Sequence, residues 1–356
     1  MPSWNDILAE ISATRDDPVQ GSRFDQVRRK YLTALAAHTG RHTILYAARW
    51  LQGVPQGSES LVAVSDEDVQ GLMSTVKDHA SPNLDLILHS PGGSPEAAES
   101  IVHYLREKFT NVRVIVPHLA MSAATMIACS ANQIVMGRQS SLGPTDPQLV
   151  LQTPLGVRAV PAQAILEQFK RAKSECRDPK LLRAWAPILP QYGPDLLVTC
   201  ENASKLTRSL VKRWLNAYLL AELAARKRGQ VVRRCATFLT SHNQHATHGR
   251  HLDREQLRKQ GIAAIIDLEA DPVLQDLVLS VYHATTICFS TLGHVAKLIE
   301  NQLGRAFIKA APIMPAGIPL PFGLPPGVRP VPLGPAPGPP PGGAPPTPAA
   351  PTPGAP

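Results

Sequence analysis

A serine and a pair of glycines stand at two similar points in the first half of the chain. Residues 84–89 form a short apolar run that stops at Ser90-Pro-Gly-Gly93, and a helical pattern follows over residues 96–109. Residues 112–117 repeat the arrangement, with Ser122 at the start of the next helix. Glycines between a strand and a helix let backbone N–H groups approach a ligand without a Cβ in the way. A serine at the positive end of a helix gains from the dipole and from nearby donors, so the pattern indicates a nucleophile.

These two turns lie within an alternation of predicted strands and helices. Residues 42–48 are apolar and β-rich, and residues 66–79 follow as a helix with Ser65 as its predicted cap and an acidic first turn. Together with the strands at 84–90 and 112–117, this gives repeated β-α units. Such units predict an α/β fold with a mostly parallel sheet and helices on its faces.

Helical spacing dominates on both sides of this core. Apolar residues recur at helical spacing before residue 40, where Ser3 is a predicted cap. Beyond residue 150, helices are predicted at 161–173, 181–185, 195–227 and 276–303. The chain is therefore divided into four parts. Residues 1–52 form an N-terminal helical segment with the first strand, and residues 53–160 form a core with both turns. Residues 161–310 form a helical region that completes the fold or mediates assembly, and residues 311–356 form a Pro/Gly/Ala-rich tail. The tail cannot bury a core, so it is expected to be disordered with polyproline II character.

The composition excludes several classes of protein. The net charge is +8, but Lys and Arg are scattered and aromatic residues make up only 5%, so no nucleic-acid partner is predicted. The five cysteines show no paired spacing, which favours free thiols in a reducing compartment. The chain has no apolar run long enough for a membrane span and no signal-peptide pattern at its N-terminus, so a cytoplasmic protein is expected.

Three ordered motifs carry a family resemblance. They are His89-Ser-Pro-Gly-Gly93, Val116-Pro-His-Leu-Ala-Met-Ser-Ala-Ala-Thr-Met-Ile-Ala128 and Ser141-Leu-Gly-Pro-Thr-Asp-Pro-Gln148. The first two resemble the fold shared by the Clp proteolytic subunit, signal peptide peptidase A and the crotonases. All three together resemble the serine dehydrogenase proteinase family of serine peptidases, from about Trp4 to Ile308.

This resemblance implies a Clp/crotonase-like fold, a polypeptide substrate and assembly as a homo-oligomer. It also implies that Ser122 is the nucleophile and that the N–H groups of Gly93 and Ala123 form the oxyanion hole. The same analogy assigns four residues to the lining of the substrate site: Gly92, Ser94, His118 and Ser141. No Gly-x-Gly-x-x-Gly fingerprint or P-loop occurs in the chain, and no cofactor is predicted.

The general base is less clearly marked in the sequence. A serine hydroxyl needs a base within hydrogen-bond reach, and a Clp-type enzyme would use a histidine, but none occurs between His118 and His242. A Ser-Lys dyad of the signal peptide peptidase A kind remains, in which a desolvated lysine accepts the proton. Lys173 is the first candidate, with Lys170 and Lys205 as alternatives, although a charged helix face is usually only solvated.

Two further features stay open. Asp146, flanked by Pro144 and Pro147, either orients the base and shapes the groove or caps a turn. The histidines between His242 and His251 recur every third position, but this spacing drifts around a helix and Gly249 interrupts it, so no metal site is predicted. A polar loop is the favoured interpretation, and a histidine of this segment such as His245 folding back as the base of Ser122 is an alternative.

Two classes of function follow from these observations. The first is a serine peptidase of endopeptidase type, in which Ser122 attacks a carbonyl and a lysine or histidine moves the proton. The second is a non-peptidase of the same fold, either a crotonase-like acyl-CoA enzyme or an inactive oligomeric scaffold. A crotonase would use two oxyanion donors on a thioester enolate and would not need Ser122.

Overall fold

The computed structural model describes residues 2–54, 58–77, 79, 81–153 and 156–311. The predicted tail at 311–356 therefore lies outside the described residues except for its first position. Within the described ranges, no helix combines the length and the apolar character that a membrane crossing requires.

A seven-stranded sheet in the order β11-β10-β1-β2-β3-β5-β9 forms the centre of the fold. Its strands are β1 His42–Ala48, β2 Asn83–His89, β3 Asn111–Val116, β5 Gln133–Met136, β9 Ile265–Asp267, β10 Val295–Asn301 and β11 Ala306–Ala310. The strands from β1 to β9 in this order run parallel, whereas β10 and β11 pair antiparallel at the other edge. The prediction of an α/β fold with a mostly parallel sheet is confirmed.

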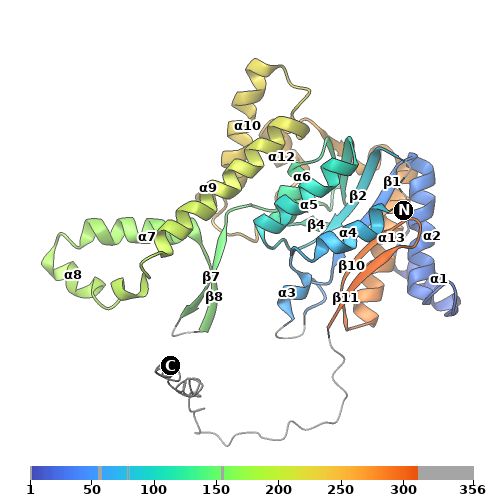
Figure 1. Cartoon of the computed structure of the whole chain (residues 1–356), viewed down its shortest axis with the longest axis horizontal. Helices are drawn as coiled ribbons and strands as arrows, with labels where there is room; N and C mark the ends of the chain where they lie inside the picture. The colour runs from blue at the N-terminus through green and yellow to red at the C-terminus, as the bar shows by residue number, and fades with distance from the viewer. Residues whose placement is uncertain (1, 55–57, 78, 80, 154–155, 312–356) are drawn as a thin grey trace, which may run out of the picture. The chain divides into compact units, whose positions relative to one another are not determined.

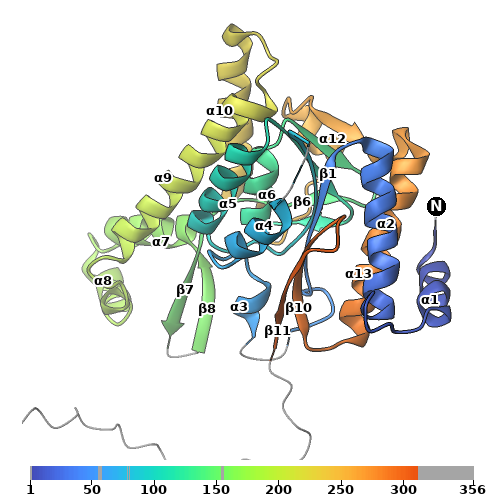
Figure 2. The same cartoon turned by 45° about the vertical axis from the view of Figure 1, so that its right-hand side comes forward.

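Helices cover both faces of this sheet, as Figures 1 and 2 show. One face carries α1 Trp4–Ala13, α2 Arg23–Thr39 and α13 Pro272–Thr291, and the other carries α3 Glu59–Val62, α4 Asp68–Val76, α5 Pro95–Lys108 and α6 Ala123–Cys129. Because side chains of a strand alternate between faces, β1 sends Ile44 and Tyr46 to the α4–α6 side and Leu45 and Ala47 to the α13 side. Both faces are buried, which explains the continuous apolar runs of the central strands.

A second group of elements forms a helical arm, whose first part projects from the core and whose last part packs against the main apolar cluster of the core (Figure 1). It comprises the hairpin β7 Gln148–Thr153 and β8 Gly156–Pro161, the helices α7 Ala162–Glu175, α8 Pro179–Trp185, η1 Leu189–Gln191 and α9 Leu196–Trp214, the π-turn η2 Leu215–Leu219 and α10 Ala225–Thr240. Short elements then lead back to the sheet: α11 His242–His245, α12 Arg254–Lys259 and η3 Leu268–Ala270. Ala162, Ile165 and Cys200 form a small apolar cluster of its own at the base of the hairpin.

The predicted helix at 276–303 is wrong in its last part. Helix α13 ends at Thr291, and the fully buried strand β10 follows. Lys297 and Glu300 both lie buried in the sheet, where Lys297 pairs with Asp68 and Glu300 with Arg28. The sequence cannot display these partners because they come from distant elements.

The predicted helix at 195–227 is also interrupted. Helix α9 ends at Trp214, and the π-turn η2 changes the direction of the chain before α10 starts at Ala225. The region 161–310 is therefore not only helical, because it also supplies β9, β10 and β11 to the sheet.

Candidate active site

Ser122 occupies a strained turn between the core sheet and helix α6. The short strands β4 Leu119–Ala120 and β6 Ser141–Leu142 pair beside this turn. Ser122 has φ 53° and ψ −119°, a left-handed conformation that costs a residue with a Cβ about 1–3 kcal/mol. All residues of α6 are buried, whereas Ser122 is only half-buried. The fold thus holds a strained serine at the one partly open position of a buried segment.

The loop after β2 approaches this serine closely enough to require glycine. A Cβ on Gly92, which has φ 95°, would lie 2.5 Å from the Cβ of Ser122. A Cβ on Gly93 would lie 2.4 Å from the backbone nitrogen and oxygen of Val64. Hydrogen bonds join the two turns: the Ser90 N–H donates to Leu119 O at 3.1 Å, and the Met121 N–H donates to Ser90 O at 2.9 Å. The two turns that the sequence marked are therefore packed against each other.

Two backbone N–H groups beside Ser122 have no acceptor within the described part of the chain. The Val64 N–H donates to Gly92 O at 2.8 Å, and Val64 O accepts from the Ser94 N–H at 3.0 Å. In such a parallel pairing the groups of the intervening Gly93 point to the opposite side. The N–H of Ala123, at the start of α6, likewise has no acceptor among the described residues. Both donors are free for a ligand.

A cleft of about 510 Å³ contains these groups. Ser122, Gly92, Gly93 and Ala123 lie on its core side, and Ala203 and Thr207 of α9 lie on the arm side. Apolar side chains form much of the rest of its wall: Val62, Met126, Pro147 and Leu149. His248 also lines this cleft, together with Ser122.

A buried carboxylate orients His248. Asp146 is 2% exposed, and its Oδ1 lies 2.7 Å from the Nδ1 of His248. Its Oδ2 lies 3.0 Å from the Nδ1 of His242 and accepts from the Gln148 amide at 3.0 Å. An ionised carboxylate only accepts hydrogen bonds, so Nδ1 of each histidine carries the proton and Nε2 of His248 is left with a lone pair. This is the tautomer that a general base requires.

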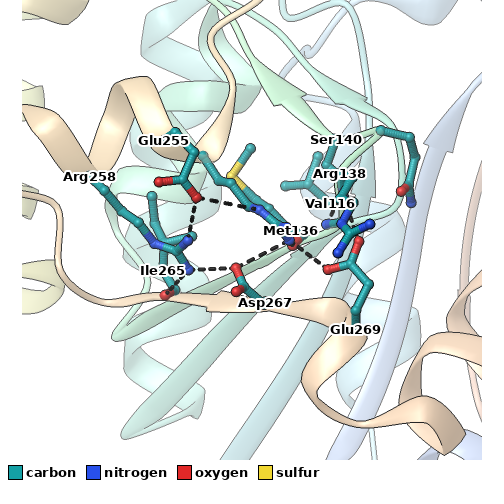
Figure 3. Close-up of polar contacts among 12 residues, drawn as sticks. Val116, Met136, Arg138, Ser140, Glu255, Arg258, Ile265, Asp267 and Glu269 are labelled. Carbon is teal, nitrogen blue, oxygen red and sulfur yellow. Dashed lines mark hydrogen bonds and ion pairs between the residues drawn. The ribbon is translucent and has the colours of Figure 1, made fainter.

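The loop that carries His248 is tied to the sheet on its far side. Leu252 and Leu142 exchange two backbone hydrogen bonds, at 2.8 and 3.0 Å. Arg254 then donates to the carbonyl of Met136 at 3.1 Å and pairs with Glu269 at 2.5 Å. Figure 3 shows the polar contacts around this point, where Arg258, Asp267 and Glu269 lie near the end of β5 at Met136. These anchors fix the chain that follows His248.

The lysines predicted as bases lie elsewhere. Lys170 and Lys173 are exposed on α7 and are not among the residues that line the cleft. Lys205 is exposed on α9, where its Nζ lies 3.5 Å from Glu201. The structure does not bring these three amines to Ser122, and their exposure provides none of the desolvation that a neutral lysine needs.

The remaining predicted residues occupy structural positions. His245 is buried, and its Nε2 lies 2.6 Å from Phe238 O. Ser94 accepts from the Ala97 N–H at 3.0 Å and so caps α5. The Nδ1 of His118 lies 2.9 Å from the hydroxyl of Tyr282, in a different pocket, and the Ser141 N–H donates to His118 O at 2.7 Å. Of the four predicted lining residues, only Gly92 lines the cleft.

His248 is the site residue that the sequence did not single out. It lies within the His-rich segment, for which the sequence analysis names His245 as a histidine that could fold back. The signal that separates them is the carboxylate: His248 contacts Asp146, whereas His245 contacts a backbone carbonyl. No spacing in the sequence records that difference.

Comparisons with known proteins agree with the geometry of the core. The family of ClpP-like SDH-type serine proteinases has a model that matches residues 59–184. Two uncharacterized proteins of Methanocaldococcus jannaschii are similar: MJ1495 is 33% identical over 130 residues, and MJ0137 is 40% identical over 99 residues. The matched parts cover 36% and 28% of this chain and span 41% and 34% of those relatives.

A solved structure was also similar in part. It is a mutant of the 1510-N membrane-bound stomatin-specific protease, with 15% identity and a TM-score of 0.34 over 57% of this chain and 74% of that chain. A TM-score of this size does not establish a shared fold, so the fold assignment rests on the topology and the family match.

Proposed function

We propose that this chain, whose residues 59–184 match the model of the ClpP-like SDH-type serine proteinases, is a serine endopeptidase with Ser122 as nucleophile, His248 as general base and Asp146 as the group that orients the base. The observation that carries this proposal is the shared cleft of Ser122 and His248, in which the buried Asp146 lies 2.7 Å from the Nδ1 of His248. Nucleophile, base and orienting carboxylate come from three separate segments of the chain.

The proposed reaction begins with proton transfer from Ser122. As the Ser122 oxygen bonds to the peptide carbonyl carbon, its proton passes to Nε2 of His248. The carbonyl oxygen becomes an oxyanion, and the N–H groups of Gly93 and Ala123 donate to it. The imidazolium then gives its proton to the leaving amine as the C–N bond breaks. Water repeats the sequence on the acyl-enzyme and restores the serine.

The surroundings of the cleft suit a polypeptide substrate. Its apolar wall would accept uncharged side chains, whereas Glu59 and Glu96 line its edge. Homo-oligomeric assembly and a cytoplasmic location stay predictions from the sequence.

The proposal is tested by covalent labelling with a fluorophosphonate, followed by mass spectrometry of the modified peptide. We expect a label on Ser122 and hydrolysis of an unstructured protein such as casein. Ser122→Ala should lose both, with an unchanged circular dichroism spectrum, because the substitution removes one oxygen atom at a turn.

The matched control is Ser94→Ala, which removes a serine hydroxyl from the same region but not from the cleft lining. It should retain the label and most of the hydrolysis. Label on another residue, or full hydrolysis by Ser122→Ala, would disprove the proposed nucleophile.

A further inference from the structure

A buried ion pair lies between helix α4 and strand β10. The Nζ of Lys297 lies 2.7 Å from Oδ2 and 2.9 Å from Oδ1 of Asp68, and both side chains are 0% exposed. Removing two charges from water is costly, and such a pair often stabilises a protein no more than apolar residues would. The contacts of this pair with the neighbouring backbone indicate a role other than stability.

The pair binds the backbone on both sides of Val64. Lys297 Nζ donates to the carbonyl of Ala63 at 2.6 Å. Asp68 Oδ2 accepts from the Ser65 N–H at 2.9 Å, and from the hydroxyl of Tyr46 at 2.6 Å. Ser65 was predicted to cap this helix, but its N–H donates to Asp68 instead. One carbonyl and one N–H, a single residue apart, are thus fixed by one buried pair.

Val64 in turn holds the glycine loop. It contacts Gly92 and Ser94 through the two backbone hydrogen bonds described above, and Gly93 lies directly on its backbone. A shift of Val64 would therefore change where the Gly93 N–H points. An oxyanion donor acts only within a narrow range of distance and angle, so a displacement of this kind reduces the rate without changing any residue of the cleft.

We propose that Lys297 and Asp68 are positioning residues of this enzyme, which hold the Gly93 N–H toward the oxyanion through the backbone of Val64. This inference rests on the proposed function. Neither Lys297 nor Asp68 lines the cleft, so their effect on the reaction passes through the chain from Ala63 to Ser65.

Arg28 supplies a matched control. It is also a fully buried cation paired with a buried carboxylate, in this case Glu300 of the same strand. Glu300 faces α2 on the opposite side of the sheet from Lys297, so Arg28 does not contact Ala63, Val64 or Ser65. Each carboxylate also has a second cation, Lys309 at 2.9 Å from Asp68 and Arg29 at 2.6 Å from Glu300. Both Lys297→Met and Arg28→Met therefore leave a buried carboxylate with one remaining cation.

The experiment compares these two variants at a temperature where both are folded. For Lys297→Met we expect kcat for a peptide substrate, and the rate of fluorophosphonate labelling, to fall by about 10- to 100-fold, with KM within threefold of the wild-type value. Hydrogen exchange of the two peptides that contain Val64 and Gly93 should accelerate. Arg28→Met should change kcat and the labelling rate by no more than about threefold, and it should leave the hydrogen exchange of these two peptides unchanged.

The inference is overturned if Lys297→Met keeps its kcat, or if Arg28→Met loses as much activity as Lys297→Met. If Lys297→Met does not fold, Tyr46→Phe is the second variant, because it removes only the hydroxyl that donates to Asp68. It should lower kcat about three- to tenfold at unchanged KM, and an unchanged kcat would overturn the inference. The exchange measurement separates the two proposals. If Lys297→Met exchanges faster but the wild-type protein is never labelled at Ser122, the proposed function is refuted and the positioning of the Gly93 loop is not.

Discussion

Two pairs of histidines, His242 with His248 and His89 with His118, differ in that the first pair contacts a carboxylate. His242 and His248 both contact Asp146. His89 and His118 instead stack on each other, with ring centroids 6.0 Å apart and an interplanar angle of 11°, beside Tyr282. Burial lowers the pKa of His89 to about 3 and lowers that of His118. Closeness to Ser122 along the chain favours His118, whereas the physical requirements of a base favour His248.

The difference shows that a histidine becomes a base through its partners. A carboxylate fixes the tautomer and stabilises the imidazolium that forms during proton transfer. In the second pair, the neutral rings serve as packing groups against α13, and the charged form is disfavoured by burial. The comparison can be tested by substitution on each side.

The largest effect is expected at His248, with His118 of the second pair as its comparison. His248→Ala should lower kcat by on the order of 10³-fold or more, because no group would then take the proton of Ser122. His118→Ala should stay within about fivefold, since it removes a ring that lines another pocket. Steady-state hydrolysis of a fluorogenic peptide measures both. The reverse order of effects would move the base to the second pair.

Sequence reasoning singled out Ser122 and Gly93 but not His248, for a physical reason. Ser122 and Gly93 sit on turns whose strands are neighbours in both the sequence and the sheet, so their proximity follows from the β-α pattern. Asp146 and His248 are 102 positions apart, and between them the chain runs through the whole helical arm. Their contact depends on the Leu142–Leu252 pairing and on Arg254, which local periodicity does not reveal.

The second effect in size concerns the carboxylate. Asp146→Asn should lower kcat by on the order of 10²- to 10³-fold, because an amide nitrogen can donate to Nδ1 of His248 and leave the proton on Nε2, the wrong tautomer. His242→Gln, which alters only the other partner of Asp146, should cost less than about tenfold. Hydrolysis and labelling rates of both variants decide this. If His242→Gln lowers kcat as much as Asp146→Asn does, then His242 is as necessary for the reaction as the carboxylate, and the two histidines act together.

The third effect is a loss of folding stability in acid, which is expected from His89 of the pair without a carboxylate. Because the pKa of His89 is about 3 when folded and about 6.5 when unfolded, the unfolded chain binds the proton first. Stability is therefore lost as the pH falls below about 6.5, and this loss continues down to about pH 3. By linkage the loss at pH 4.5 is about 3 kcal/mol, and His89→Phe should remove it.

Denaturant unfolding at pH 7 and pH 4.5 measures this loss. The same substitution at His103, which is exposed on α5, is the control and should leave the difference between the two pH values unchanged. A wild-type difference that His89→Phe does not reduce would assign the acid lability to other groups.

The smallest effects are expected at the three lysines that sequence spacing favoured. Lys173→Ala, Lys170→Ala and Lys205→Ala should each stay within about threefold of wild-type hydrolysis, because these exposed side chains on α7 and α9 are not among the residues that line the cleft. The Lys205 side chain is 72% exposed, so the loss of its ion pair with Glu201 should also leave stability nearly unchanged. If one of these variants loses the Ser122 label while His248→Ala keeps it, then the arm must close to bring that lysine to the cleft. The base would then be an amine desolvated only in that closed state.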